Sequence, residues 1–167
     1  MKKIALAILL SAFVAAPAFA ADGKNSVGVN YGMDINGTFG IQGEFDVSSS
    51  FNKAPVSVQV FWKKASETYF SVSADTTALG VAGIYDLSST LKLDKKIQPY
   101  AGAGIRRVTA TVVYPGIPGF IPATTGSASD MELHLTIGAK YSLTPEFSAD
   151  LNYNDFGGLT FGAEYKF

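Results

Sequence analysis

Apolar and polar residues alternate with a period of two along most of this chain, and the pattern recurs in eight segments. The last segment shows it clearly, because Leu159, Phe161, Ala163, Tyr165 and Phe167 are apolar whereas Thr, Gly, Glu and Lys stand between them. Side chains on a β-strand point alternately to its two faces. Each segment is therefore expected to be a strand with one apolar and one polar face, and the chain is expected to be all-β.

The other seven segments begin near residues 27, 39, 56, 79, 101, 131 and 147. Phe61 and Ile84 break the alternation, since each places a large apolar side chain on the polar face. Between the segments lie turn sequences rich in Pro, Ser and Gly, which are Asn36-Gly37 and the stretches 48–55, 88–99 and 143–145. Residues 108–130 contain Pro115, Pro118 and Pro122 and predict the longest irregular loop, while 64–77 is expected to be a loop with partial strand character.

The composition of the polar face indicates which way the strands face. It is rich in Gly, Ser and Asn with scattered charges of both signs, which suits the narrow interior of an eight-stranded barrel. The apolar face carries aromatic residues near the strand ends, as at the two boundaries of a membrane: Tyr31, Phe39, Trp62, Tyr85, Tyr141, Tyr153 and Phe167. Only 16% of the residues are charged. The chain is predicted to be an eight-stranded antiparallel up-and-down transmembrane β-barrel, and the alternative is a soluble periplasmic barrel or sandwich.

The first 20 residues have the three parts of a signal peptide. Lys2 and Lys3 are basic, Ile4 to Ala16 is apolar, and Ala18-Phe19-Ala20 fits the small-x-small cleavage rule. An apolar run of about 13 residues falls short of the roughly 20 that a membrane-spanning helix needs. Residues 1–20 are therefore predicted to be cleaved, leaving residues 21–167 as one barrel domain.

An even number of strands places both ends of the barrel domain on the periplasmic side. The outer connections would then be residues 34–37, 64–77, 108–130 and 155–158. Within the longest of them, an exposed group of apolar and aromatic residues is expected to bind a surface ligand or to lie against the membrane: Tyr114, Ile117, Phe120 and Ile121.

Three stretches resemble the OmpA/OmpX-like superfamily of small outer-membrane barrels. Residues 98–105, Gln-Pro-Tyr-Ala-Gly-Ala-Gly-Ile, look like the Pro-Tyr-x-Gly-x-Gly entry to a central strand, and residues 138–145 look like the turn before the last hairpin. Tyr165 and the final Phe167 resemble the C-terminal signal of outer-membrane proteins. The resemblance implies a Gram-negative outer-membrane location, contact with outer-membrane lipid and lipopolysaccharide, and insertion by the outer-membrane assembly machinery, which reads the terminal strand.

The polar face includes a set of ionisable residues that is expected to form a paired network filling the lumen: Glu44, Asp46, Lys63, Arg106, Glu132, His134, Lys140 and Glu164. The leading functional interpretation is a non-enzymatic barrel with a structural or surface-interaction role. Two alternatives remain, which are a lipid A-modifying enzyme using His134 near Thr136, and a narrow channel. Without Cys, and with one His, the chain offers no metal site or cofactor motif, and it has no basic patch for nucleic acid.

Overall fold

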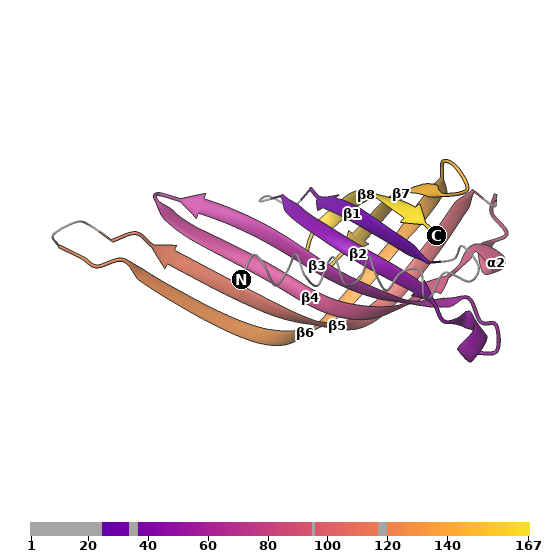
Figure 1. Ribbon diagram of the computed structural model, residues 1–167, viewed down its shortest axis with the longest axis horizontal. Coiled ribbons are helices and arrows are strands. Elements are labelled where there is room, and N and C mark those ends of the chain that lie inside the picture. The colour runs from indigo at the N-terminus through magenta and orange to yellow at the C-terminus, as the bar shows by residue number, and fades with distance from the viewer. Residues whose placement is uncertain (1–24, 34–36, 95, 117–119) are drawn as a thin grey trace.

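The computed structural model describes residues 25–33, 37–94, 96–116 and 120–167. Eight antiparallel strands, each hydrogen-bonded to the next, close into a barrel (Figure 1). They are β1 (Ser26–Gly32), β2 (Thr38–Asp46), β3 (Val56–Tyr69), β4 (Val72–Asp86), β5 (Ile97–Tyr114), β6 (Thr124–Ser142), β7 (Phe147–Asn154) and β8 (Gly158–Lys166). The predicted fold is confirmed. The predicted signal peptide, the turn residue Asn36 and the loop residue Ile117 lie outside the described residues.

The two ends of the barrel differ. At one end, called the inner end, the connections include the 3-10 helix η1 (Ser48–Ser50) and the short helix α2 (Ser88–Leu91). At the other, called the outer end, the hairpins β3–β4 and β5–β6 extend well beyond the rest of the barrel (Figure 1). Strands β3 to β6 have 14 to 19 residues each, whereas the other four have 7 to 9. Among the described residues, no helix is long and apolar enough to cross a membrane.

The barrel is apolar outside and polar inside. Large apolar side chains on the outer face are about half exposed, for example Val29 at 51%, Leu133 at 61% and Ile137 at 59%. Most of the buried side chains are polar, and they include Asn, Gln, Ser, Thr, Lys and Glu. This is the reverse of a soluble barrel, in which the apolar face would be buried.

Phe61 and Ile84, the two exceptions to the alternation, point into the lumen, where they are 1% and 2% exposed. Each has a glycine as its cross-strand partner, because Phe61 pairs with Gly80 and Ile84 pairs with Gly102. A Cβ atom at either glycine would meet the ring or the methyl group of its partner. The missing side chains therefore leave the space that these two large residues fill in a narrow barrel.

The register between the strands tilts them relative to the barrel axis. Following paired residues once round the barrel leads from Gly138 on β6 to Ala128 on the same strand, ten residues nearer its outer end. A shear of this size in eight strands corresponds to a tilt of about 40°. Two residues that are paired across neighbouring strands therefore lie at different heights in the membrane. Going from β1 toward β8, each residue lies a little more than one residue further toward the outer end than its partner on the preceding strand.

The prediction of a long irregular loop at 108–130 is wrong, and the loop expected at 64–77 is much shorter than predicted. Residues 108–130 are mostly strand, because β5 continues to Tyr114 and β6 begins at Thr124, and the three prolines all lie between them. Residues 64–77 are also strand except for a two-residue turn at Phe70 and Ser71, where both backbones have positive φ. The β-branched residues in these segments favour extended backbone, and this signal outweighs the turn composition near the prolines.

Candidate functional site

Lys140 is the centre of an ion-pair network in the inner half of the lumen. Its Nζ lies 2.6 Å from Glu44 Oε2 and 2.9 Å from Glu164 Oε2. Glu164 is 2% exposed and also accepts hydrogen bonds from Gln42 Nε2 at 2.7 Å and Ser26 Oγ at 3.3 Å. The network contains residues of β1, β2, β6 and β8. It therefore connects β1 and β8, whose pairing closes the barrel, to β6 on the other side of the lumen.

A second chain of hydrogen bonds runs along the lumen face of β7. Tyr100 Oη donates to Asp150 Oδ1 at 2.9 Å, and Asn152 Nδ2 donates to Asp150 Oδ2 at 2.8 Å. Asn154 Nδ2 then donates to Asn152 Oδ1 at 3.0 Å and to Thr160 Oγ1 at 2.9 Å. The alternation that begins at Phe147 puts Asp150 on the polar face, but the predicted network did not include it. Its pairing with the Tyr100 hydroxyl depends on a contact between β5 and β7, which the alternation does not reveal.

Arg106 closes the outer mouth of the lumen. Its Nη2 and Nε donate to Glu132 Oε2 at 2.7 and 3.1 Å, and its Nη1 donates to Asp155 Oδ1 at 2.6 Å. His134 Nδ1 lies 2.9 Å from the same Asp155 oxygen, and its ring packs at 4.4 Å on Phe61. Asp155 is a further residue that the sequence prediction assigned only to a loop.

His134 is not placed as a catalytic base for Thr136. The imidazole is 1% exposed and lies between Phe61, Arg106 and Asp155, and among the described residues its hydrogen-bond contacts are to Arg106 and Asp155 alone. A hydroxyl nucleophile needs its base within hydrogen-bond reach and an approach for the substrate. A lipid outside the barrel has no access to an imidazole at this depth.

Two of the predicted network residues have other surroundings. Lys63 is 5% exposed, and its Nζ lies 5.3 Å from the centre of the Phe61 ring. No carboxylate of the described residues lies within ion-pair distance of it. Asp46 lies at the inner mouth, where its Oδ1 accepts a hydrogen bond from the Ser48 backbone at 2.8 Å.

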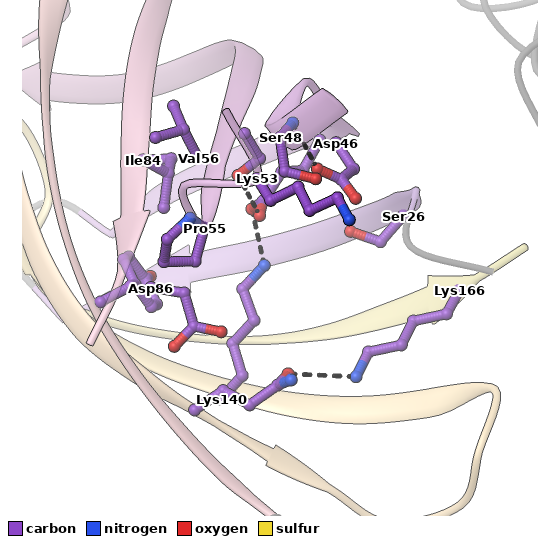
Figure 2. A pocket seen from close by; sticks show the side chains of 14 residues that line it. Ser26, Asp46, Ser48, Lys53, Pro55, Val56, Ile84, Asp86, Lys140 and Lys166 are labelled. Carbon is purple, nitrogen blue, oxygen red and sulfur yellow. Dashed lines mark hydrogen bonds and ion pairs between the residues drawn. The ribbon is translucent and has the colours of Figure 1, made fainter. Parts of the chain in front are cut away.

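The inner mouth forms a cavity of about 370 Å³ with mixed charge. Figure 2 shows Lys53, Lys140 and Lys166 projecting into it from different walls, with Asp46 and Asp86 among them. Buried polar side chains, including those described above, line the lumen beyond this cavity. Within the described residues, no group of three His, Asp or Glu side chains is arranged to hold a metal ion.

The outer halves of β3 to β6 form a four-stranded sheet, called the outer sheet, that continues past the barrel wall. Strand β6 pairs with β5 over residues 124–141 but with β7 only over residues 136–142. Of the predicted loop residues, Phe120 and Ile121 lie near the tip of the β5–β6 hairpin and are 87% and 47% exposed, and Tyr114 ends β5 and is half-buried.

The two terminal aromatic residues lie on the outer face at the inner end. The Tyr165 ring contacts Phe147 at 5.2 Å and Phe167 at 6.5 Å between ring centres, and the Phe167 backbone N–H donates to Asn25 O. Their role as an assembly signal stays a prediction.

Comparison with known proteins identifies the family of the chain. A profile of the protein family described as outer membrane protein beta-barrel domain matches residues 6–167. The chain belongs to this family. As a member of the outer membrane protein beta-barrel family, it resides in the Gram-negative outer membrane, so its exposed apolar band faces lipid. A comparison with curated protein sequences finds no significant match.

Solved structures with similar folds are small outer-membrane barrels. The N-terminal barrel of Pseudomonas aeruginosa OprF is 14% identical with a TM-score of 0.55, covering 86% of this chain and 96% of that one. Neisserial surface protein A is 17% identical with a TM-score of 0.57, covering 86% and 94%. Yersinia pestis Ail in complex with the heparin analogue sucrose octasulfate is 16% identical with a TM-score of 0.52, covering 86% and 96%. At such identities these similarities show the fold alone.

Proposed function

We propose that this family member is a surface-interaction barrel, whose lumen network stiffens the wall and whose outer sheet binds an extended segment of a partner protein. The observation that carries the proposal is the edge of β6, where residues 124–134 pair with β5 but, among the described residues, with no strand on the other side. An unpaired edge is a row of free backbone donors and acceptors, which an extended segment joins as an added strand.

The alternation of the backbone identifies the residues whose N–H and C=O groups point toward that edge. Leu135 O accepts a hydrogen bond from Asp155 N on the β7 side, so every second residue before it points its polar backbone groups the same way. At Met131 the N–H is already taken, since Asp130 Oδ1 accepts it at 2.7 Å. The backbone groups of Thr125, Ser127 and Ser129 remain on the edge, and their short side chains leave room for a neighbouring strand.

The charges and the hairpin tips of the outer sheet favour a protein over a polyanion. The residues from 64 to 77 and from 107 to 132 include two basic side chains and four acidic ones: Lys64, Arg107, Glu67, Asp75, Asp130 and Glu132. Ail binds a heparin analogue in its complex, but a polyanion is bound by a cluster of basic side chains, and on this sheet Lys64 is already paired with Asp75. Phe70 and Phe120, at the two tips, are 90% and 87% exposed and offer apolar contacts to a protein.

Replacing Ser127 with Pro tests the edge. Proline removes the N–H that points away from β5 and adds a ring on the free side, while the pairing with β5 keeps its hydrogen bonds. Cells displaying each protein are tested for adhesion to a panel of immobilised extracellular proteins. Ser127→Ala, which keeps the N–H, is expected to adhere like the wild type, and Ser127→Pro is expected to lose adhesion.

Folding is checked for each protein by the mobility shift between unboiled and boiled samples. If all three folded proteins adhere equally, the edge is not the binding site. If the wild type adheres to no protein of the panel, the surface-interaction function is not supported, and a structural role in the envelope becomes the better interpretation.

Export and insertion belong to the same proposal. Cleavage after Ala20 would release residues 21–167 into the periplasm, and the assembly machinery would read the terminal strand through Tyr165 and Phe167. Mass spectrometry of the protein from outer membranes tests the first step, with an N-terminus at Ala21 expected. Phe167→Ala tests the second and is expected to lower the amount of heat-modifiable protein.

A further inference from the structure

The cavity at the inner mouth of the barrel has the size of a small-ligand site. Its volume of about 370 Å³ lies at the small end of the range of ~300–1,000 Å³ that is typical of such sites. Lys140 and Tyr100 are the buried polar residues of its deep part. Lys140 already binds Glu44 and Glu164, and the Tyr100 hydroxyl binds Asp150, so these groups have little capacity left. A ligand is therefore held by the less buried groups of the walls.

The charged residues of the lining compensate each other. Three are basic and three are acidic: Lys53, Lys140, Lys166, Glu44, Asp46 and Asp86. Their formal charges sum to zero, so neither a polyanion nor a polycation matches the cavity as a whole. A ligand with one group of each sign does match it, provided that a basic and an acidic side chain remain available to bind it.

Lys166 is a basic side chain that remains available. It is half-buried at the end of β8, and its Nζ lies 3.2 Å from Gln98 Oε1 and 3.3 Å from Ser142 Oγ. Both partners are neutral, and among the described residues no carboxylate lies within ion-pair distance of this ammonium group. The two contacts orient Nζ at the cavity wall (Figure 2). An ammonium group has three donors, so a carboxylate of a ligand can accept the third hydrogen bond.

Asp86 is the corresponding acidic side chain. It is half-buried at the end of β4, where its Oδ1 accepts a hydrogen bond from Ser88 N at 2.7 Å. In the part of the chain that the structure describes, no basic side chain lies within ion-pair distance of this carboxylate. Strands β4 and β8 are four strands apart in a closed barrel of eight. Asp86 and Lys166 therefore lie on opposite sides of the mouth (Figure 2).

The wall beside Asp86 is apolar. Pro55, Val56 and Ile84 lie together on this side of the cavity (Figure 2). The Asp86 backbone N–H donates to Pro55 O at 2.9 Å, which fixes the carboxylate next to the apolar group. A ligand that places an amino group at Asp86 can bury an apolar side chain on the adjacent wall, and this burial favours binding.

We propose that the inner mouth binds a short peptide with a free amino terminus, a free carboxyl terminus and an apolar first residue. The terminal ammonium group pairs with Asp86, and the first side chain packs on the apolar wall. The terminal carboxylate pairs with Lys166, so that charge-assisted hydrogen bonds fix both ends of the ligand. The site lies at the opposite end of the barrel from the outer sheet, so it goes beyond the proposed function and stands without it.

The test measures binding of defined peptides to the full barrel in detergent micelles by the changes of its amide NMR signals. The probes are Leu-Gly and Leu-Gly-Gly, which span about 7 and 11 Å when extended. The tighter of the two is compared with its N-acetylated form, with its C-terminal amide and with the analogue that has Gly in place of Leu. Acetylation removes the positive charge of the peptide, and amidation removes the negative charge.

The proteins are the wild type, two variants of the site and one control. Asp86→Asn keeps the oxygen that accepts from Ser88 N but loses the charge, and Lys166→Gln keeps a donor for Gln98 but loses the charge. Lys96→Gln removes an exposed charge at the inner end that does not line the cavity. Folding of each protein is checked by the mobility shift between unboiled and boiled samples.

The free peptide is expected to bind the wild type and Lys96→Gln equally. Acetylation and amidation should each weaken binding to the wild type about tenfold, the effect of one charge-assisted hydrogen bond. Replacing Leu with Gly should weaken it about fivefold to tenfold through the lost apolar contact. Asp86→Asn should bind the free and acetylated peptides equally, and Lys166→Gln should bind the free and amidated peptides equally, because each variant has lost the group that distinguishes them.

Three results would overturn the proposal. The first is that the folded wild type binds neither peptide at concentrations up to about 10 mM. The second is that the acetylated or the amidated peptide binds the wild type as tightly as the free one. The third is that folded Asp86→Asn still prefers the free peptide to the acetylated one by the factor seen for the wild type. If Lys166→Gln does not insert, the amidated peptide tests the same contact on the wild type.

Discussion

Lys140 compensates two carboxylates inside the barrel, so replacing it with Met should destabilise the protein strongly. The change leaves the volume similar but removes contacts of 2.6 Å to Glu44 and 2.9 Å to Glu164. Glu164 is 2% exposed and would keep only the neutral donors of Gln42 and Ser26. Removing one partner of a buried ion pair costs about 3–5 kcal/mol, because the remaining charge is uncompensated.

A double-mutant cycle separates this cost from lost packing. Glu164→Gln alone should cost about 1–3 kcal/mol, since it weakens one set of charged hydrogen bonds. The double variant, which also carries Lys140→Met, no longer has the uncompensated charge of Glu164. Its loss of free energy of unfolding should therefore be smaller than the sum of the losses of the two single variants by at least about 1 kcal/mol. Lys96→Met, at an exposed position, should change the stability by less than about 0.5 kcal/mol.

The assay is urea unfolding of the barrel in lipid vesicles, followed by the fluorescence of Trp62, the single tryptophan, and by gel mobility of unboiled samples. The free energy of unfolding is compared at equal slopes with respect to urea. Additive costs within about 0.5 kcal/mol, or a loss below about 1 kcal/mol for Lys140→Met, would refute the reasoning. Either result would mean that the carboxylates are protonated or hydrated in the lumen.

Four further predictions follow from the packing and the register. Gly104→Ala should destabilise the barrel by about 2–3 kcal/mol in the same unfolding assay, because a Cβ there meets the backbone of the neighbouring strand, whereas Gly126→Ala, with nothing within 4 Å, should be neutral. Replacing residues 111–127 with Asn-Gly should preserve the heat-modifiable barrel, since Ala110 and Ala128 are already paired; loss of the mobility shift would show that the outer hairpin is needed for folding. Arg106→Met should lower the free energy of unfolding by about 1–2 kcal/mol, less than Lys140→Met does, because the side chains of Glu132 and Asp155 are 43% and 35% exposed. The same variant should show no unit conductance in planar bilayers, whereas defined channel openings would support the channel alternative. His134→Ala should leave the acylation of lipid A unchanged in mass spectra, and a lost acyl product would instead establish an enzyme.

The sequence by itself determined the class of fold and the side of each strand that meets lipid. A period of two assigns every residue to a face, and the scarcity of charge on the apolar face indicates lipid rather than water. The exceptions are also explained by sequence once the pairing is known, since Phe61 and Ile84 each meet a glycine across the strand. The lumen orientation of Arg106 and Lys140 follows from the same alternation.

Only the tertiary structure decided the strand lengths and the partners within the lumen. Prolines near 115–122 concealed the extension of β5 and β6, because turn composition says where a hairpin reverses but not how far its strands pair. Glu44 and Lys140 are 96 positions apart, and their contact depends on the register of every strand between them. The alternation assigns a face but no height along the barrel. Height follows from the shear, which is a property of the closed sheet, and it is the shear that places Asp155 beside Arg106.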